Sequence, residues 1–273
     1  METNRFDRTK PKMSIIIPSW FTKTQHGRYM ENETFWLAQE CLKKLIERTP
    51  REDYELIIID NGSTLDLDYD NVTQGWWSTN EYWEMADILI RNKKNLGFAP
   101  ACNQGFAVAR GDYICCLNND IVVWPGWLDA MLSIYEKELD PKVGVVMPAL
   151  MKETKNAHVA LKLETIDTKT NRGKYGAGAE FGSLWIAKRE LLKEVAKKRD
   201  GYQVYDENFK LGFGEDRWLW QEIRLLGFDT YRTHDTRVFH QGNMSYGKVP
   251  DRKKFSSANR EYLAKLKKEH NIK

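Results

Sequence analysis

The chain has 273 residues, of which 41% are apolar and 30% charged, a composition typical of a soluble globular protein with a sizeable core. No apolar run approaches the ~18 residues that a membrane-spanning helix needs, and the polar segment 1–12 lacks the apolar stretch of a signal peptide. We therefore expect a cytoplasmic protein, whose four cysteines stay reduced and pack as small core residues.

Short apolar runs alternate with amphipathic helical patterns through the first half of the chain. Buried strands are predicted at residues 13–18, 55–60, 88–90, 113–117 and 143–147. Helices are predicted over residues 33–48, 98–110 and 125–139. This alternation indicates an α/β fold with a mostly parallel, Rossmann-like sheet and helices on both of its faces.

Two polar stretches interrupt this pattern. Residues 65–85 are polar and acidic and carry three tryptophans, so they are predicted to form a long excursion from the core. Residues 152–172 follow no helical or strand period. Regular patterns return with an apolar strand at 184–186, a helix over 215–226 that Gly227 ends, and a strand that closes at His240.

Asp60 and Asp120 each stand at the end of an apolar strand. Ligands of open α/β sheets gather outside the carboxyl ends of the strands, so the two aspartates are expected to share one crevice. Asn118-Asn119-Asp120 offers one carboxylate and two amides, which suits a Mg²⁺ or Mn²⁺ ion whose other ligands are phosphate oxygens and water. A strand-end turn or helix cap explains these three residues equally well when they are taken alone.

A carboxylate pair, Glu215-Asp216, opens a predicted helix directly after Gly214. An aspartate within hydrogen-bond reach of an acceptor hydroxyl can take its proton as a new C–O bond forms. The alternative is a pair of acidic residues placed to suit the helix dipole. His240 offers a second metal ligand, although a lone histidine is more often structural.

Several blocks in one order carry a resemblance to a known family. They are residues 14–19, 58–64, 95–105 and 117–120, followed by 205–209, 214–216 and 238–240. Together they resemble the family 2 glycosyltransferases of the GT-A fold, and particularly the rhamnosyltransferase-like branch. The likeness extends over residues 13–245, as a single domain with a donor half at 13–125 and an acceptor half at 126–245, between the polar segment 1–12 and a basic helical tail at 246–273.

This resemblance implies an inverting transfer of a sugar from a nucleotide-diphosphate donor to an acceptor hydroxyl, most naturally on a glycan or a lipid-linked saccharide. The residues that it implies around the nucleotide sugar are Pro18, Ser19, Asp60, Asn61, Asn95, Gly97, Asn103, Asn118 and Asn119.

The same resemblance assigns the chemistry. Asp216 is the implied base, Glu215 helps to place the acceptor, and Asp120 with His240 holds Mn²⁺ or Mg²⁺. The chemistry is consistent, because a metal stabilises the leaving diphosphate while a base activates the nucleophile on the opposite side of the anomeric carbon. Many relatives carry an aspartate where Asn118 stands, so metal affinity is expected to be weaker here.

The C-terminal segment 248–273 holds nine Lys or Arg against three Asp or Glu, a local charge of +6 in a chain of net +3. Such a segment suits a polyanionic acceptor such as DNA bearing hydroxymethylated bases, or an anionic membrane surface that carries a lipid-linked acceptor. The favoured interpretation is an amphipathic helix that packs Tyr262, Leu263 and Leu266 on the body and keeps its lysines in water.

A non-catalytic carbohydrate-binding protein on the same fold remains an alternative, because fold does not imply function. Intact Asp120, Asp216 and His240 argue against it.

Overall fold

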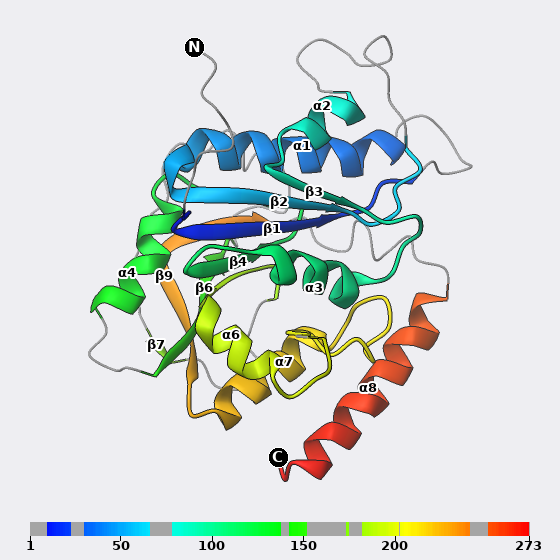
Figure 1. Cartoon of the computed structure of the whole chain (residues 1–273), viewed down its shortest axis with the longest axis vertical. Helices are drawn as coiled ribbons and strands as arrows, with labels where there is room; N and C mark the ends of the chain where they lie inside the picture. The colour runs from blue at the N-terminus through cyan, green and yellow to red at the C-terminus, as the bar shows by residue number, and fades with distance from the viewer. Residues whose placement is uncertain are drawn as a thin grey trace.

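The computed structural model describes residues 10–22, 30–65, 78–137, 142–151, 173–174, 182–201, 203–240 and 251–272 (Figure 1). The unassigned stretch 152–172, most of the N-terminal segment 1–12 and residues 66–77 of the predicted excursion lie outside the described residues. Among the helices that are described, none is long and apolar enough to cross a membrane.

A nine-stranded sheet runs through the described residues, in the order β3-β2-β1-β4-β8-β6-β9-β5, with β7 paired to β9. The strands are β1 Met13–Ser19, β2 Tyr54–Asp60, β3 Ile88–Arg91, β4 Tyr113–Leu117, β5 Ile121–Val122, β6 Val143–Leu150, β7 Gly173–Lys174, β8 Leu184–Lys188 and β9 Asp229–His240. The strands β1 to β4 lie parallel, as predicted. The sheet as a whole is mixed rather than mostly parallel, because β8 runs antiparallel to both β4 and β6.

The register of the sheet aligns the strand ends that the sequence singles out. Ser19 pairs with Asp60 at the carboxyl ends of β1 and β2, and the Asn61 amide donates to the carbonyl of Ser19 over 2.8 Å. Because both strands are almost wholly buried, their continuous apolar runs fit the middle of a sheet covered on two sides.

Helices cover both faces of this sheet, as predicted (Figure 1). They are α1 Met30–Arg48, α2 Thr79–Glu84, α3 Phe98–Val108, α4 Trp127–Lys137, α6 Arg189–Ala196, α7 Glu215–Leu225 and α8 Arg252–Glu269, with a 3₁₀ turn at Arg51–Asp53. In Figure 1, α1 and α2 lie on one side of β1 to β3 and α3 on the other. The α/β single-domain fold is thereby confirmed.

The prediction that residues 65–85 leave the core is wrong for the part that the structure describes. Ser78 and Glu81 form a reciprocal capping box that starts α2. This helix buries Tyr82 and Trp83 in the main core, where the Tyr82 ring packs edge-on against Phe21. The Ser-x-x-Glu spacing was readable in the sequence as a helix start.

The basic tail forms α8 over Arg252–Glu269, shown in red in Figure 1. Tyr262, Leu263 and Leu266 are half-buried, whereas Lys265 and Lys268 are exposed, so the burial follows the predicted amphipathic pattern. All four cysteines are free and buried, as expected.

Candidate active site

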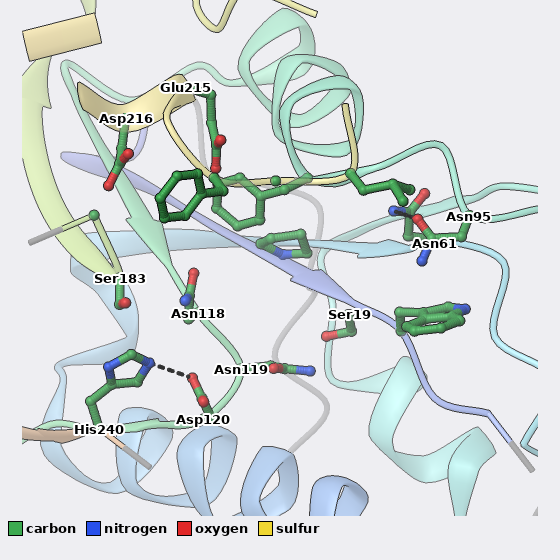
Figure 2. A pocket seen from close by; sticks show the side chains of 17 residues that line it. Ser19, Asn61, Asn95, Asn118, Asn119, Asp120, Ser183, Glu215, Asp216 and His240 are labelled. Atoms are coloured by element: carbon green, nitrogen blue, oxygen red, sulfur yellow. Dashed lines mark hydrogen bonds and ion pairs between the residues drawn. The ribbon is translucent and has the colours of Figure 1, made fainter. Parts of the chain in front are cut away.

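A cavity of about 300 Å³ opens where the carboxyl ends of β1 and β4 meet the start of α7 (Figure 2). Its lining includes ten residues that the sequence singles out: Pro18, Ser19, Asn61, Asn95, Asn118, Asn119, Asp120, Glu215, Asp216 and His240. Segments that are up to about two hundred residues apart therefore contribute to one site.

Asp120 and His240 meet because β5 pairs antiparallel with the end of β9. Ile121 lies opposite His240 in this ladder, which places Asp120 beside the imidazole. His240 Nε2 is 3.3 Å from Asp120 Oδ1, the contact drawn as a dashed line in Figure 2. The pair offers one carboxylate and one imidazole donor to the cavity.

Within the part of the chain that the structure describes, no three His, Cys, Asp or Glu side chains gather as a ready metal cage. Two protein donors at the wall of a cavity nevertheless fit Mg²⁺ or Mn²⁺, which usually keep several waters and bind through one or two protein groups plus substrate phosphates. The donor set therefore suits a cation that arrives together with a phosphorylated ligand.

The two asparagines before Asp120 carry buried polar atoms that point to a ligand. Asn118 Oδ1 and Asn119 Nδ2 have no hydrogen-bond partner among the described residues. Buried polar groups are nearly always paired, so unpaired ones at a cavity wall indicate a bound molecule or water. The backbone of Asn118 is fixed by its amide, which donates to the carbonyl of Ser183 over 2.8 Å.

Glu215 and Asp216 form the first turn of α7, directly after Gly214, whose φ of 103° belongs to the left-handed region. Glu215 is 6% exposed, and one of its carboxylate oxygens, Oε2, has no partner within the described chain. Burial, with a further contribution from the Asp216 charge, raises the pKa of Glu215 to about 8. Burial also raises the pKa of Asp216. Near neutral pH the pair therefore holds a proton on Glu215.

Removing the Glu215 charge should change how stability depends on pH. The raised pKa means that the folded protein binds the Glu215 proton more tightly than the unfolded chain does. Between about pH 4.5 and 8 the unfolded chain releases this proton while the folded protein keeps it, so the stability of the wild type falls as pH rises through this range. We expect the Tm of Glu215→Gln to exceed that of the wild type by more at pH 8.5 than at pH 5.0. A calorimetric comparison at the two pH values measures this difference, and an equal Tm difference at both would contradict the raised pKa.

Asn61 is held in a network of amides at another side of the cavity. Its Nδ2 donates to Asn95 Oδ1 over 3.0 Å and to the carbonyl of Gly97 over 3.1 Å. Its Oδ1 accepts from Asn92 Nδ2 and from the amide of Leu96, each over 3.1 Å. The network joins the end of β2 to the loop before α3 and so shapes the cavity wall next to Ser19.

Three residues predicted to contact the nucleotide sugar are not among the residues that line the cavity. Asp60 accepts from the amide of Ser63 over 2.9 Å within a turn. Gly97 contributes its carbonyl to Asn61, as described above. Asn103 exchanges hydrogen bonds of 2.9 Å with the backbone of Tyr205 in both directions. These contacts give the three residues supporting positions in the wall.

The cavity is also lined by residues to which the sequence patterns give no role. They are Trp20, Gly182, Ser183 and Leu211, whereas Phe98 belongs to the block 95–105 and Gly212 and Phe213 precede the Glu215–Asp216 pair. Trp20 stands two residues after the end of the strand predicted at 13–18, so its position was a usable signal. Gly182 and Ser183 enter because β8 runs antiparallel to β4 and begins where β4 ends, with Leu184 opposite Leu117.

Gly182 leaves room for the Asp216 carboxylate. A Cβ atom at position 182 would lie 2.3 Å from Asp216 Oδ2 and 2.9 Å from its Cγ. A side chain at this position would therefore have to displace the carboxylate.

Structural comparison places the fold among known enzymes. The GalNAc-T7 structure with UDP, GalNAc and Mn²⁺ aligns with a TM-score of 0.58 at 18% identity, covering 98% of this chain and 55% of that one. Residues 1–349 of TarS from S. aureus align with a TM-score of 0.57 at 13% identity, covering 93% of this chain and 69% of that one. Both likenesses support the GT-A fold.

Curated relatives match over shorter stretches. Glycosyltransferase GlyG of Streptococcus pneumoniae is 26% identical over 136 residues, 48% of this chain and 38% of its own length. The poly(ribitol-phosphate) beta-glucosyltransferase of Bacillus spizizenii is 29% identical over 110 residues, 40% of this chain and 15% of its own length. In two further relatives the matched stretch is 13% and 19% of the relative's length, so this chain spans only a small part of these proteins.

The sequence profile of the family described as "Glycosyl transferase family 2" matches residues 32–196, more than half of the chain. This match includes the amide network, the Asp120 strand end and the start of β8. The chain belongs to glycosyl transferase family 2.

Proposed function

We propose that the protein transfers a sugar from a nucleotide-diphosphate donor to an acceptor hydroxyl with inversion at the anomeric carbon. One observation carries this proposal: the Asp120–His240 pair and the Glu215–Asp216 pair line a single cavity, in the lower and the upper part of the view in Figure 2 respectively. The cavity thus provides a place for a leaving diphosphate and, across from it, a place for a base.

Mn²⁺ or Mg²⁺ bound by Asp120 and His240 would neutralise charge on the leaving diphosphate. On the other side of the sugar, Asp216 takes the proton of the acceptor hydroxyl. The acceptor oxygen forms its bond to the anomeric carbon as the bond from that carbon to the diphosphate oxygen breaks. The products are the glycoside, with inverted configuration, and the nucleoside diphosphate.

The remaining predicted contacts divide between direct and supporting positions. Pro18, Ser19, Asn61 and Asn95 line the cavity and are proposed to surround the nucleotide. The unpaired Asn118 and Asn119 atoms are proposed to bind the donor, since a ligand would satisfy them. Asp60, Gly97 and Asn103 are proposed to act through the wall that they support.

The acceptor is proposed to be a hydroxyl of a glycan or of a lipid-linked saccharide. The resemblance to family 2 enzymes motivates this choice. The rhamnosyltransferase-like branch supplies one donor sugar to test among several.

A panel of nucleotide sugars tests the proposal, with release of free nucleoside diphosphate measured in Mn²⁺ or Mg²⁺ and again in excess chelator. UDP sugars come first, because the GalNAc-T7 structure and a TarS complex each contain UDP. We expect slow, chelator-sensitive release from one donor. Binding of a donor without release, on any acceptor supplied, would favour a non-catalytic carbohydrate-binding protein.

Gly182→Ala should impair transfer while leaving the donor site intact. The new Cβ would overlap the Asp216 carboxylate, and misplacing a catalytic group by about 1 Å can cost about 10²-fold in rate. We expect kcat to fall by about that factor with donor affinity within twofold of wild type. Gly126→Ala is the matched control, because its φ of 73° makes alanine strained but no atom lies within 4 Å of the added Cβ. If Gly182→Ala transfers at the wild-type rate, the assigned role of Asp216 is wrong.

A further inference from the structure

The loop in front of α7 has an unusual backbone. Four successive residues have positive φ: Leu211 at 61°, Gly212 at 127°, Phe213 at 97° and Gly214 at 103°. Residues with a Cβ rarely adopt this region, so two of the four positions need support from their surroundings. The loop lines the cavity and leads directly into Glu215 and Asp216.

One side chain of α8 supplies that support. Asn259 is 2% exposed, and its Nδ2 donates to the carbonyls of Lys210, Gly212 and Phe213 at 2.9, 3.3 and 3.1 Å. Its Oδ1 accepts from the amide of Lys210 over 3.0 Å. A single amide group therefore bonds to three residues of the loop, because it offers a donor NH₂ and an acceptor oxygen at once.

Other contacts hold α8 in place beside the loop (Figure 1). The Tyr262 hydroxyl donates to Asp206 Oδ2 over 2.9 Å, and the Tyr262 ring packs edge-on against Phe209 at 5.1 Å. The Arg260 guanidinium carbon lies 5.1 Å from the Phe213 ring centroid. The helix is thus anchored one and three residues after Asn259, which holds its amide beside the loop.

We propose that Asn259 is a positioning residue, which holds the loop 210–214 in the conformation that presents Glu215 and Asp216 to the cavity. The connection is short, because Gly214 accepts the first backbone bond of α7 from Trp218 over 3.0 Å. A relaxed loop would rotate the first turn of α7 and move both carboxylates. The inference rests on the proposed function, since it assigns these carboxylates to the acceptor side of a transferase.

Two substitutions test the role of the amide. Asn259→Ala removes every side-chain bond to the loop. Asn259→Asp keeps the size of the side chain and the acceptor for the Lys210 amide, but it places a carboxylate oxygen, which cannot donate, against the three backbone carbonyls. For both we expect kcat for transfer to fall about 10- to 100-fold. The affinity for UDP with Mn²⁺, measured by titration calorimetry, should stay within twofold, because Ser19 and Asn61 lie on other elements.

Lys268→Ala is the matched control, as it changes an exposed side chain of the same helix and leaves the Asn259 contacts and the Tyr262 anchor in place. It should transfer within twofold of wild type. All rates are taken well below each Tm, so that loss of folded protein does not enter kcat.

Amide exchange gives a readout that does not depend on any activity. The Lys210 amide donates to Asn259 Oδ1, so its exchange should accelerate in Asn259→Ala and stay slow in Asn259→Asp. If exchange over 210–214 is unchanged in Asn259→Ala, or if both Asn259 variants keep kcat within twofold, the proposal fails. If the wild type transfers no sugar at all, the proposed function fails, while exchange still decides whether Asn259 holds the loop.

Discussion

Asp216→Asn should lower the rate of sugar transfer by about 10²- to 10⁴-fold, the usual contribution of a positioned general base. The amide has the same shape as the carboxylate but cannot take the proton of the acceptor hydroxyl. The raised pKa of Asp216, caused by burial, brings its basicity closer to neutral pH and so favours proton transfer. Donor affinity should stay within twofold, as measured by calorimetry with UDP and Mn²⁺.

Glu215→Gln provides the contrast, because Glu215 is already protonated at pH 7 when its pKa is about 8. Glutamine is a neutral mimic of that state, so we expect a loss at pH 7 at least tenfold smaller than in Asp216→Asn. In the wild type the rate should fall above pH 8 as a second negative charge forms, and Glu215→Gln should lack that fall. Equal losses in the two variants at pH 7 would overturn the division of roles between the two carboxylates.

The parallel half of the fold was predictable because its signals are local. β1 and β2 are continuous apolar runs that are buried on both faces of the sheet. At their ends, Ser19 pairs with Asp60 in the strand register. Strand ends gather at one edge of a parallel sheet, which places Asp60 and Asp120 at that edge, but of the two only Asp120 lines the cavity.

Pairing partners in the second half could not be predicted in this way. An apolar strand such as β8 has the same pattern whichever direction it runs, and here it runs antiparallel to β4. That direction brings Gly182 and Ser183 to the cavity, where the expected parallel direction would have placed them at the opposite edge. Only tertiary contacts determine this outcome.

Asparagines show a second limit of sequence analysis. Asn118 and Asn103 belong to equally asparagine-rich blocks, yet one lines the cavity and the other bonds to the backbone of Tyr205, 102 residues away. An amide side chain serves a ligand or a loop equally well, so its role depends on what the fold places against it. Asn259, in a helix that the charge pattern marks only as basic, was missed for the same reason.

Asp120→Asn should raise the concentration of Mn²⁺ needed for transfer and lower the maximal rate by about 10²-fold or more, since metal stabilisation of a leaving group contributes several kcal/mol. The substitution removes the carboxylate that lies 3.3 Å from His240 Nε2 and leaves the imidazole as the one strong donor of this pair. Electron paramagnetic resonance of Mn²⁺ with UDP measures the binding step separately from turnover. Unchanged Mn²⁺ affinity in Asp120→Asn would contradict the assigned metal site.

Asn118→Asp tests the same site in the opposite direction. Asn118 lines the cavity with a buried Oδ1 that has no partner among the described residues, so a carboxylate at this position would add an anionic ligand close to Asp120. Because the charge of the ligand set tunes cation affinity, the Mn²⁺ concentration for half-maximal transfer should fall by on the order of tenfold. A weaker Mn²⁺ response in Asn118→Asp would place the cation away from this strand end, since added negative charge can only strengthen binding of a cation that lies beside it.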